Sequence, residues 1–105
     1  MPGDSLDVRI ADAGHEWLVT CEGDLDVSSA CRFRESIESR LAWLPERVFL
    51  DLERIAFIDP EGIDAVVKIA LATRTNGIML TVSANEWLRR ILDSVGVGSL
   101  VTLRS

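Results

Sequence analysis

The sequence predicts a single α/β domain: a mixed, mostly parallel β-sheet with about three α-helices. Three observations predict it. The chain has 105 residues, 48 % of them are hydrophobic, and apolar runs of β type alternate with helix-type periodicity. The expected order of elements is ββαβαβαβ, within one domain that spans residues 1–105.

The first elements are a β-hairpin and a helix. Val8 and Ile10 alternate with polar neighbours, and a turn around His15, the single histidine, leads into an apolar strand at 17–21. We expect His15 to be a solvated turn residue. Residues 23–26 should break the strand, and Ser28 or Ser29 should cap a helix whose inward face comprises Ala30, Phe33, Ile37, Leu41 and Leu44.

A central strand and a clearly marked helix start come next. Residues 47–52 are nearly all apolar, which predicts a strand covered on both faces, and the apolar signal continues to Ile58. Asp59 suits the N-cap, Pro60 the first helical position and Glu61 the first turn. Asn76-Gly77 should end this helix. Its expected buried stripe is Ile63, Val66, Val67, Ala70 and Leu71.

The last elements are a strand, a helix and a short strand. Residues 78–82 form an apolar run, Asn85 suits an N-cap, and Gly96 and Gly98 provide a stop before a strand at 100–103. The residues expected to face inward from this helix are Leu88, Ile91, Leu92 and Val95. Trp87, in its first turn, is a candidate for partial exposure and for a docking role.

Composition excludes several classes of function. A formal net charge of −6 disfavours nucleic acids and anionic membrane surfaces, both of which attract basic proteins. No uninterrupted apolar run is long enough to span a bilayer, and the first residues lack the pattern of a secretory signal, so we expect a cytoplasmic protein with no membrane insertion. No cofactor or metal motif is evident.

The two cysteines, Cys21 and Cys31, are too few for a disulfide scaffold and lack C-x-x-C spacing. Packed, reduced thiols are one interpretation, and a redox switch between the two is the alternative. Cys31 is the better redox candidate, because the dipole at the start of a helix lowers a thiol pKa.

Three loops should gather at the carboxyl ends of the parallel strands, where α/β proteins bind their partners. They are residues 23–28, 58–62 and 83–85, and they form an acidic, polar end of the sheet. Each polar residue has a structural alternative, because aspartates such as Asp24 and Asp26 make turns, and serines such as Ser28 and Ser83 cap helices.

These loops carry short motifs in a fixed order: G-D-L-D at 23–26, F-I-D-x-x-G at 57–62 and L-R-R-I-L-x-x-x-G-V at 88–97. In combination they resemble the STAS domain family, which includes the anti-sigma factor antagonists of bacteria. The resemblance extends from about Leu6 to Leu103, and it implies that the mixed sheet and its helices have a STAS-like arrangement.

The resemblance implies a regulatory, non-enzymatic protein that binds an anti-sigma factor with an ATP-binding kinase domain and thereby releases a sigma factor. In that family the partner phosphorylates a Ser or Thr directly after an aspartate, which ends binding. Asp59 and Gly62 match the family's aspartate and glycine, but Pro60 stands at the acceptor position and Glu61 follows it. The chain is therefore expected to be a non-phosphorylatable variant. The expected partner-binding residues are Asp24, Asp26, Ser28, Asp59, Pro60, Glu61, Gly62 and Ser83.

Several alternatives stay open at this point. Glu61 either compensates the helix dipole or partly imitates a phosphate. The acidic loops could instead hold a magnesium ion, although no nucleophile with a neighbouring base accompanies them. STAS relatives also suggest a module that binds a nucleotide or serves in a transporter or another STAS-containing complex. The sequence leaves a monomer and a weak dimer equally open.

Overall fold

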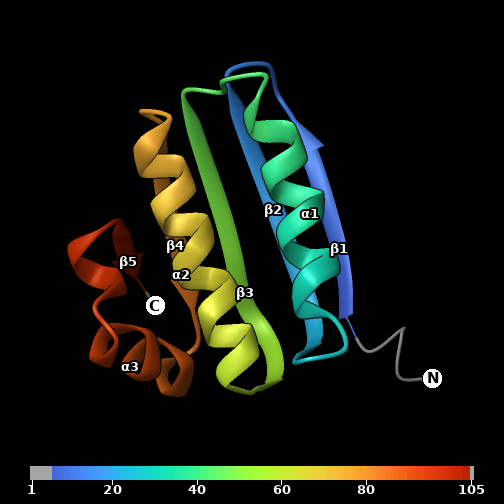
Figure 1. Ribbon diagram of the computed structural model, residues 1–105, viewed down its shortest axis with the longest axis vertical. Coiled ribbons are helices and arrows are strands. Elements are labelled where there is room, and N and C mark those ends of the chain that lie inside the picture. The colour runs from blue at the N-terminus through green and yellow to red at the C-terminus, as the bar shows by residue number, and fades with distance from the viewer. Residues whose placement is uncertain (1–5, 105) are drawn as a thin grey trace.

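The computed structural model describes residues 6–104 and contains five strands, three α-helices and one 3₁₀ turn (Figure 1). The elements, in chain order, are β1 (Leu6–Asp12), β2 (Glu16–Leu25), α1 (Ala30–Leu41), β3 (Arg47–Ile58), α2 (Pro60–Thr75), β4 (Met79–Ala84), α3 (Glu86–Ser94), η2 (Val97–Ser99) and β5 (Thr102–Arg104). The predicted order ββαβαβαβ is confirmed.

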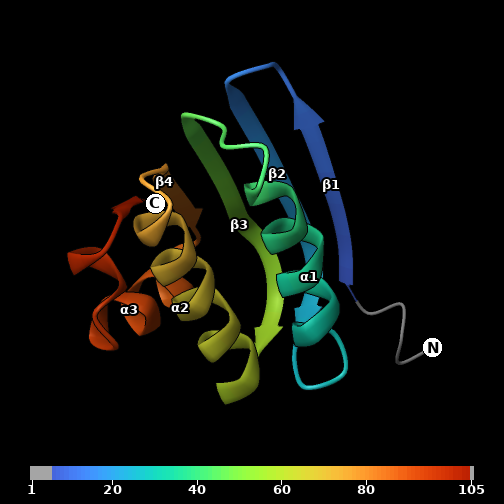
Figure 2. The ribbon, with the colours of Figure 1, turned by 45° about the horizontal axis from the view of Figure 1, so that its top comes forward.

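The sheet has the strand order β1-β2-β3-β4-β5. β1 is antiparallel to β2, and every other neighbouring pair is parallel. Because parallel crossovers are right-handed, strands that are added in one direction place their connecting helices on the same face of the sheet. Figures 1 and 2 show α1 and α2 side by side over that face, with α3 next to β4 and β5. The fold is therefore a mixed, mostly parallel sheet covered from one side.

The opposite face of the sheet is open. Along β3 the burial alternates, with Val48, Leu50 and Leu52 buried while Phe49 is 36 % exposed. Leu18 on β2 and Met79 on β4 are exposed on the same face. The expectation that the 47–52 strand is covered on both faces is therefore wrong, because sequential strand order leaves no helix for the second face.

One hydrophobic core fills the space between the sheet and the helices. Its largest fully buried side chains are Phe33, Leu25, Ile37, Leu50, Leu52, Ile69, Leu88, Leu92, Val19, Val48, Val66 and Val82. Within α1, the predicted inward residues Ala30, Phe33, Ile37 and Leu41 are all buried.

Three residues predicted to face inward are exposed instead: Leu44, Leu71 and Val95. Leu44 follows the end of α1, and Val95 follows the end of α3, so neither continues its helix stripe. On α2 the buried stripe is rotated toward Gly62, Ala65, Ile69 and Thr73, together with the predicted Val66 and Ala70. Glycine and alanine make up half of the buried residues of this helix.

The predicted helix ends are mostly correct. The side chain of Asp59 accepts a hydrogen bond from Gly62 N–H, and Asn85 accepts one from Leu88 N–H, so both act as N-caps. Gly77 and Gly96 adopt the positive φ angles of helix stops, +69° and +91°. Ser29 occupies the N-cap position of α1, but its side chain makes no capping bond.

Several strand boundaries differ from the prediction, most clearly those of β2 and β5. β2 does not break at 23–26 but runs to Leu25, with register shifts against β3 at Thr20/Glu22 and Gly23/Asp24. These irregularities absorb the glycine and the turn-type residues without ending the pairing. The last strand begins at Thr102, because the residues before it form the 3₁₀ turn.

Gly62 is required by a close approach between α2 and β2. A Cβ atom at this position would overlap the carbonyl oxygen of Leu25 and lie 2.8 Å from Ile58 Cγ1. Both neighbours belong to well-packed parts of the chain, so they cannot move aside cheaply.

We expect Gly62→Ala to lower the free energy of unfolding by about 1–3 kcal/mol, because backbone has to shift to admit one methyl group. Gly98→Ala is the matched control, since the atom its Cβ would meet is the movable carboxylate oxygen Oδ1 of Asp93. Urea denaturation followed by circular dichroism measures both. Equal losses in the two variants would contradict the role given to Gly62.

Candidate functional site

The carboxylate of Asp59 joins two loops at the carboxyl end of the sheet. Its Oδ1 accepts a hydrogen bond from Gly62 N at 2.9 Å, and its Oδ2 accepts one from Val27 N, also at 2.9 Å. The backbone N–H of Asp59 donates to the carbonyl oxygen of Leu25 at 3.3 Å. Asp59 therefore holds the start of α2 against the loop between β2 and α1.

Asp26 and the two serines after it form a self-contained hydrogen-bonded loop. Asp26 Oδ1 accepts from the backbone N of Ser28 at 3.0 Å and from its hydroxyl at 2.6 Å. Ser29 is buried, and its hydroxyl donates to the carbonyl oxygen of Asp24 at 2.9 Å and accepts from Asp26 N at 3.0 Å. The hydrogen bond from the Ser28 side chain lowers the pKa of Asp26, which favours its ionised form. Asp26 thus makes the turn and keeps its negative charge.

Near this junction four residues are exposed, namely Val27, Phe57, Pro60 and Glu61, and we call this group of residues the docking face. Val27 is 72 % exposed and Phe57 is 52 % exposed. Pro60 and Glu61 are also exposed and open α2. The surface therefore combines apolar side chains with a carboxylate, next to the ionised Asp26.

Val27 and Phe57 were not identified from the sequence. Phe57 lies in an apolar run that predicts burial, and Val27 lies between an aspartate and two serines. The sequence contains a signal for the exposure of Phe57 but none for Val27. Phe57 precedes Ile58 in a strand, and because neighbouring strand side chains point to opposite faces, only one of the two can face the core.

The structure brings most, but not all, of the predicted site residues together. Asp24 is half-buried and pairs with Phe57 across β2 and β3. Ser83 pairs with Asp51, eight residues before Asp59 on β3, and its hydroxyl donates to Glu53 Oε2. Because β3 extends well beyond β4, Ser83 does not reach the docking face.

The predicted loop at residues 83–85, where β4 ends and α3 begins, stabilises the fold. The side-chain amide of Asn85 donates to the carbonyl oxygens of Glu53 and Ile55, both at 3.3 Å, and so ties the start of α3 to β3. Trp87, in the first turn of α3, is 42 % exposed, which agrees with its predicted partial exposure.

Neither cysteine is activated. Burial raises the pKa of the Cys21 thiol to about 12, with the negative charges of Asp51 and Asp7 adding to the effect. Cys31 is exposed, and its thiol donates a hydrogen bond to Glu35 Oε1 at 3.4 Å, which raises its pKa. The expectation that the helix start lowers the pKa of Cys31 is wrong, because the neighbouring carboxylate favours the protonated thiol.

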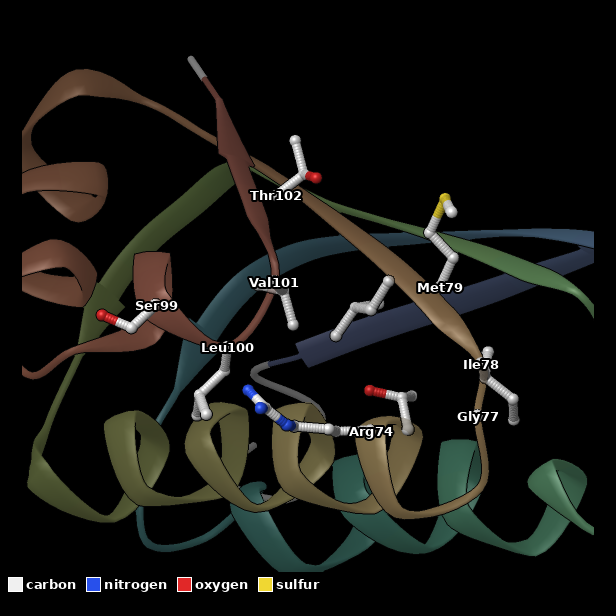
Figure 3. A pocket seen from close by; sticks show the side chains of 10 residues that line it. Arg74, Gly77, Ile78, Met79, Ser99, Leu100, Val101 and Thr102 are labelled. Carbon is white, nitrogen blue, oxygen red and sulfur yellow. The ribbon is translucent and has the colours of Figure 1, made fainter.

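The remaining features to consider are the cavities, the groups that could hold a metal ion and the helices that could span a membrane. A cavity of about 490 Å³ is lined by residues of the last turn of α2, the start of β4 and the segment before β5, with Arg74 as its charged residue (Figure 3). Within residues 6–104 no group of three or more His, Cys, Asp or Glu residues is arranged to hold a metal ion. Across the same residues, no helix combines the length and apolar character needed to cross a membrane.

Comparison with known proteins gives a consistent result. The sequence model of the STAS domain matches residues 8–105. No curated protein has a significantly similar sequence. Solved structures are similar in fold at low sequence identity. An anti-sigma factor antagonist from Mycobacterium paratuberculosis has a TM-score of 0.81 at 20 % identity, over 96 % of this chain and 86 % of that one.

Two further structures are similar to a comparable degree. The phosphorylated form of the Bacillus cell fate determinant SpoIIAA has a TM-score of 0.74 at 14 % identity, over 94 % of this chain and 92 % of that one. An RsbS variant from Moorella thermoacetica has a TM-score of 0.78 at 16 % identity, over 93 % and 85 % of the two chains. At these identities the likeness establishes the fold.

We expect Asp59→Ala to lower the free energy of unfolding by about 1–2 kcal/mol, because it removes an N-cap and leaves the N–H groups of Val27 and Gly62 without acceptors. Amide hydrogen exchange should accelerate at these two groups in particular. Asp64→Ala is the control, since among the described residues the Asp64 side chain forms only an exposed pair with Lys68 at 3.0 Å, worth about 0.5 kcal/mol or less. Unchanged exchange at Val27 would show that Asp59 does not hold the two loops together.

Proposed function

The chain belongs to the STAS domain family, and we propose that it is a protein-binding regulatory module of the anti-sigma factor antagonist kind. The proposed partner is an anti-sigma factor with an ATP-binding kinase domain, and binding would control the release of a sigma factor. The observation that carries the proposal is the docking face: Val27 and Phe57 are exposed next to the Asp59 junction, at the end of the sheet where the family motif lies.

The composition of the docking face supports a protein partner rather than a small ligand. Exposed apolar side chains surrounded by charged groups are typical of interfaces, in which a few residues supply most of the binding energy. Val27 and Phe57 are the apolar candidates, and Glu61 and the ionised Asp26 supply negative charge. We therefore expect the complementary partner surface to be apolar at its centre and basic at its rim.

The second part of the proposal is that this module has no phosphorylation switch at the family position. Pro60 carries neither a hydroxyl group to accept a phosphate nor a backbone N–H. Glu61 carries a single negative charge, whereas a phosphoserine carries about 1.5 to 2. We propose that Glu61 compensates the dipole of α2 and that the module binds its partner constitutively.

Incubation of the protein with ATP and an anti-sigma kinase recovered from its source cells tests this part. By mass spectrometry we expect no phosphate on the wild-type chain, whereas the Pro60→Ser variant should acquire one phosphate at the substituted position. Phosphorylation of the wild-type chain, for example at Ser28, would contradict the proposal. Recovery of a transporter or another STAS protein without a kinase, or stabilisation by millimolar GTP or ATP, would favour the alternative functions.

Two phenylalanines at opposite ends of β3 test the docking face itself. We expect Phe57→Ala to weaken binding to the anti-sigma factor at least about fivefold, which corresponds to about 1 kcal/mol. Phe49→Ala is the matched control, because Phe49 is also exposed but lies eight residues earlier on β3, so its replacement should leave the affinity unchanged. Isothermal titration calorimetry measures both. A loss confined to Phe49→Ala would move the interface to the other end of β3.

A further inference from the structure

The outer side of β1 is the longer of the two sheet edges within residues 6–104. β1 is the outermost strand, and among these residues it pairs with β2 alone (Figures 1 and 2). It has seven residues, whereas β5, at the other edge, has three. Because an edge strand presents unpaired backbone N–H and C=O groups, a long edge is a template for pairing with a further strand. The edge of β1 belongs to no part of the proposed function.

The hydrogen bonds of the β1–β2 hairpin show which backbone groups of β1 point outward. Ala13 N donates to the carbonyl oxygen of Glu16 at 2.9 Å where the hairpin turns, so these two residues form a hydrogen-bonded pair. In an antiparallel ladder such pairs alternate with pairs that are not hydrogen-bonded, so every second residue of β1 turns toward β2. The residues whose backbone groups point to the open edge are Leu6, Val8, Ile10 and Asp12.

A contact from α1 agrees with this orientation. The guanidinium of Arg32 donates from Nη2 to the carbonyl oxygen of Leu6 at 3.1 Å, which fits an oxygen that points away from β2. A carbonyl oxygen has two lone pairs, so that of Leu6 can accept a further hydrogen bond. The outward N–H groups of Val8 and Ile10 have no acceptor among residues 6–104.

The side chains of β1 alternate in character between the two faces of the sheet. Leu6 is buried, and Val8 and Ile10 are half-buried against the core. Asp7 and Arg9 point to the opposite face, where their side chains are 56 % and 81 % exposed and form an ion pair at 2.9 Å. One acidic and one basic residue, two positions apart on an edge strand, make a charge pattern that is complementary to itself when the strand direction is reversed.

These charges select one register for pairing between two copies of the chain. In an antiparallel arrangement centred on Val8, Asp7 of each chain lies opposite Arg9 of the other. Opposite charges directly across two strands are favourable, and like charges are unfavourable. A centre at Asp7 or at Arg9 places like charges opposite each other, and a centre at Ile10 places Arg9 opposite Ala11. The register centred on Val8 is therefore favoured, and it leaves Asp7 and Arg9 in pairs that are not hydrogen-bonded, where side chains are closest.

We propose that β1 pairs antiparallel with β1 of a second copy of this chain, about a twofold axis at Val8, so that the two sheets become continuous. Val8 of each chain exchanges both backbone hydrogen bonds with Val8 of the other, and Leu6 does so with Ile10. The arrangement is isologous, as in most homodimers. Because the interface is only one strand long, the dimer is weak and depends on concentration. It requires neither the docking face nor an anti-sigma factor.

A charge-exchange set of variants, measured by sedimentation equilibrium, tests the pairing. We expect the wild-type chain to dimerise reversibly at concentrations up to about 1 mM, where weak complexes are populated. Arg9→Asp and Asp7→Arg should each weaken dimerisation at least about tenfold, because each places like charges across the axis. An equimolar mixture of these two variants should form a mixed dimer, and the double variant should dimerise as the wild-type chain does. Arg90→Asp is the control, because it changes the net charge equally but lies on exposed α3.

Amide hydrogen exchange, followed by NMR, locates the interface. The N–H groups of Arg9 and Ala11, which face β2, should be protected at every concentration. Those of Val8 and Ile10 should exchange rapidly in dilute samples and become protected as the concentration rises.

Several results would overturn the proposal. They are a monomer throughout this concentration range, a dimer that leaves exchange at Val8 and Ile10 unchanged, and a dimer that Arg9→Asp does not weaken. Protection of Val8 and Ile10 only in the presence of an anti-sigma factor would also overturn it, because the edge would then bind that partner. Since the side chains of Asp7 and Arg9 are exposed, their variants should keep the wild-type circular dichroism spectrum, which excludes unfolding as the cause of lost dimerisation.

Discussion

The contact between the start of α2 and the end of β2 is the constraint on which the rest of this molecule depends. Gly62 lies so close to the carbonyl oxygen of Leu25 that no larger residue fits, and Asp59 uses both carboxylate oxygens to hold Gly62 and Val27. A helix start and a loop 32 residues earlier are thereby fixed to each other. Without this junction, the loop that carries Val27 would not be held against the start of α2.

Within the F-I-D-x-x-G motif, two residues have structural roles and the two between them are exposed. Asp59 and Gly62 have roles in capping and close packing, both of which serve the fold itself. The two residues between them, Pro60 and Glu61, are exposed and are not part of the hydrophobic core. Proline at position 60 therefore leaves the junction intact, and it suits the first helical position.

The sequence predicted the elements and their order because helix caps, glycine stops and apolar periodicity are local signals, as at Asp59, Asn85 and Gly77. It could not predict the open sheet face, since the apolar run containing Phe49 reads the same whether one or both faces are covered. The hydrogen bond between Asp59 and Val27 could not be predicted either, because it joins residues that are 32 positions apart and depends on tertiary structure. The pKa of Cys31 was wrongly predicted for a related reason: the nearby Glu35 outweighs the helix start.

The position of the docking face at one end of the sheet determines which part of the molecule a partner covers. β2 runs from the β1–β2 turn to the docking loops, and its ten residues at about 3.3 Å each extend roughly 30 Å. A partner bound at the docking loops therefore contacts one end of this strand and leaves the other end exposed. For a module that binds its partner constitutively, as proposed, occupancy of the docking face follows local concentration. A second partner that links the module to a particular site or complex would raise its concentration there and change this occupancy without changing the intrinsic affinity.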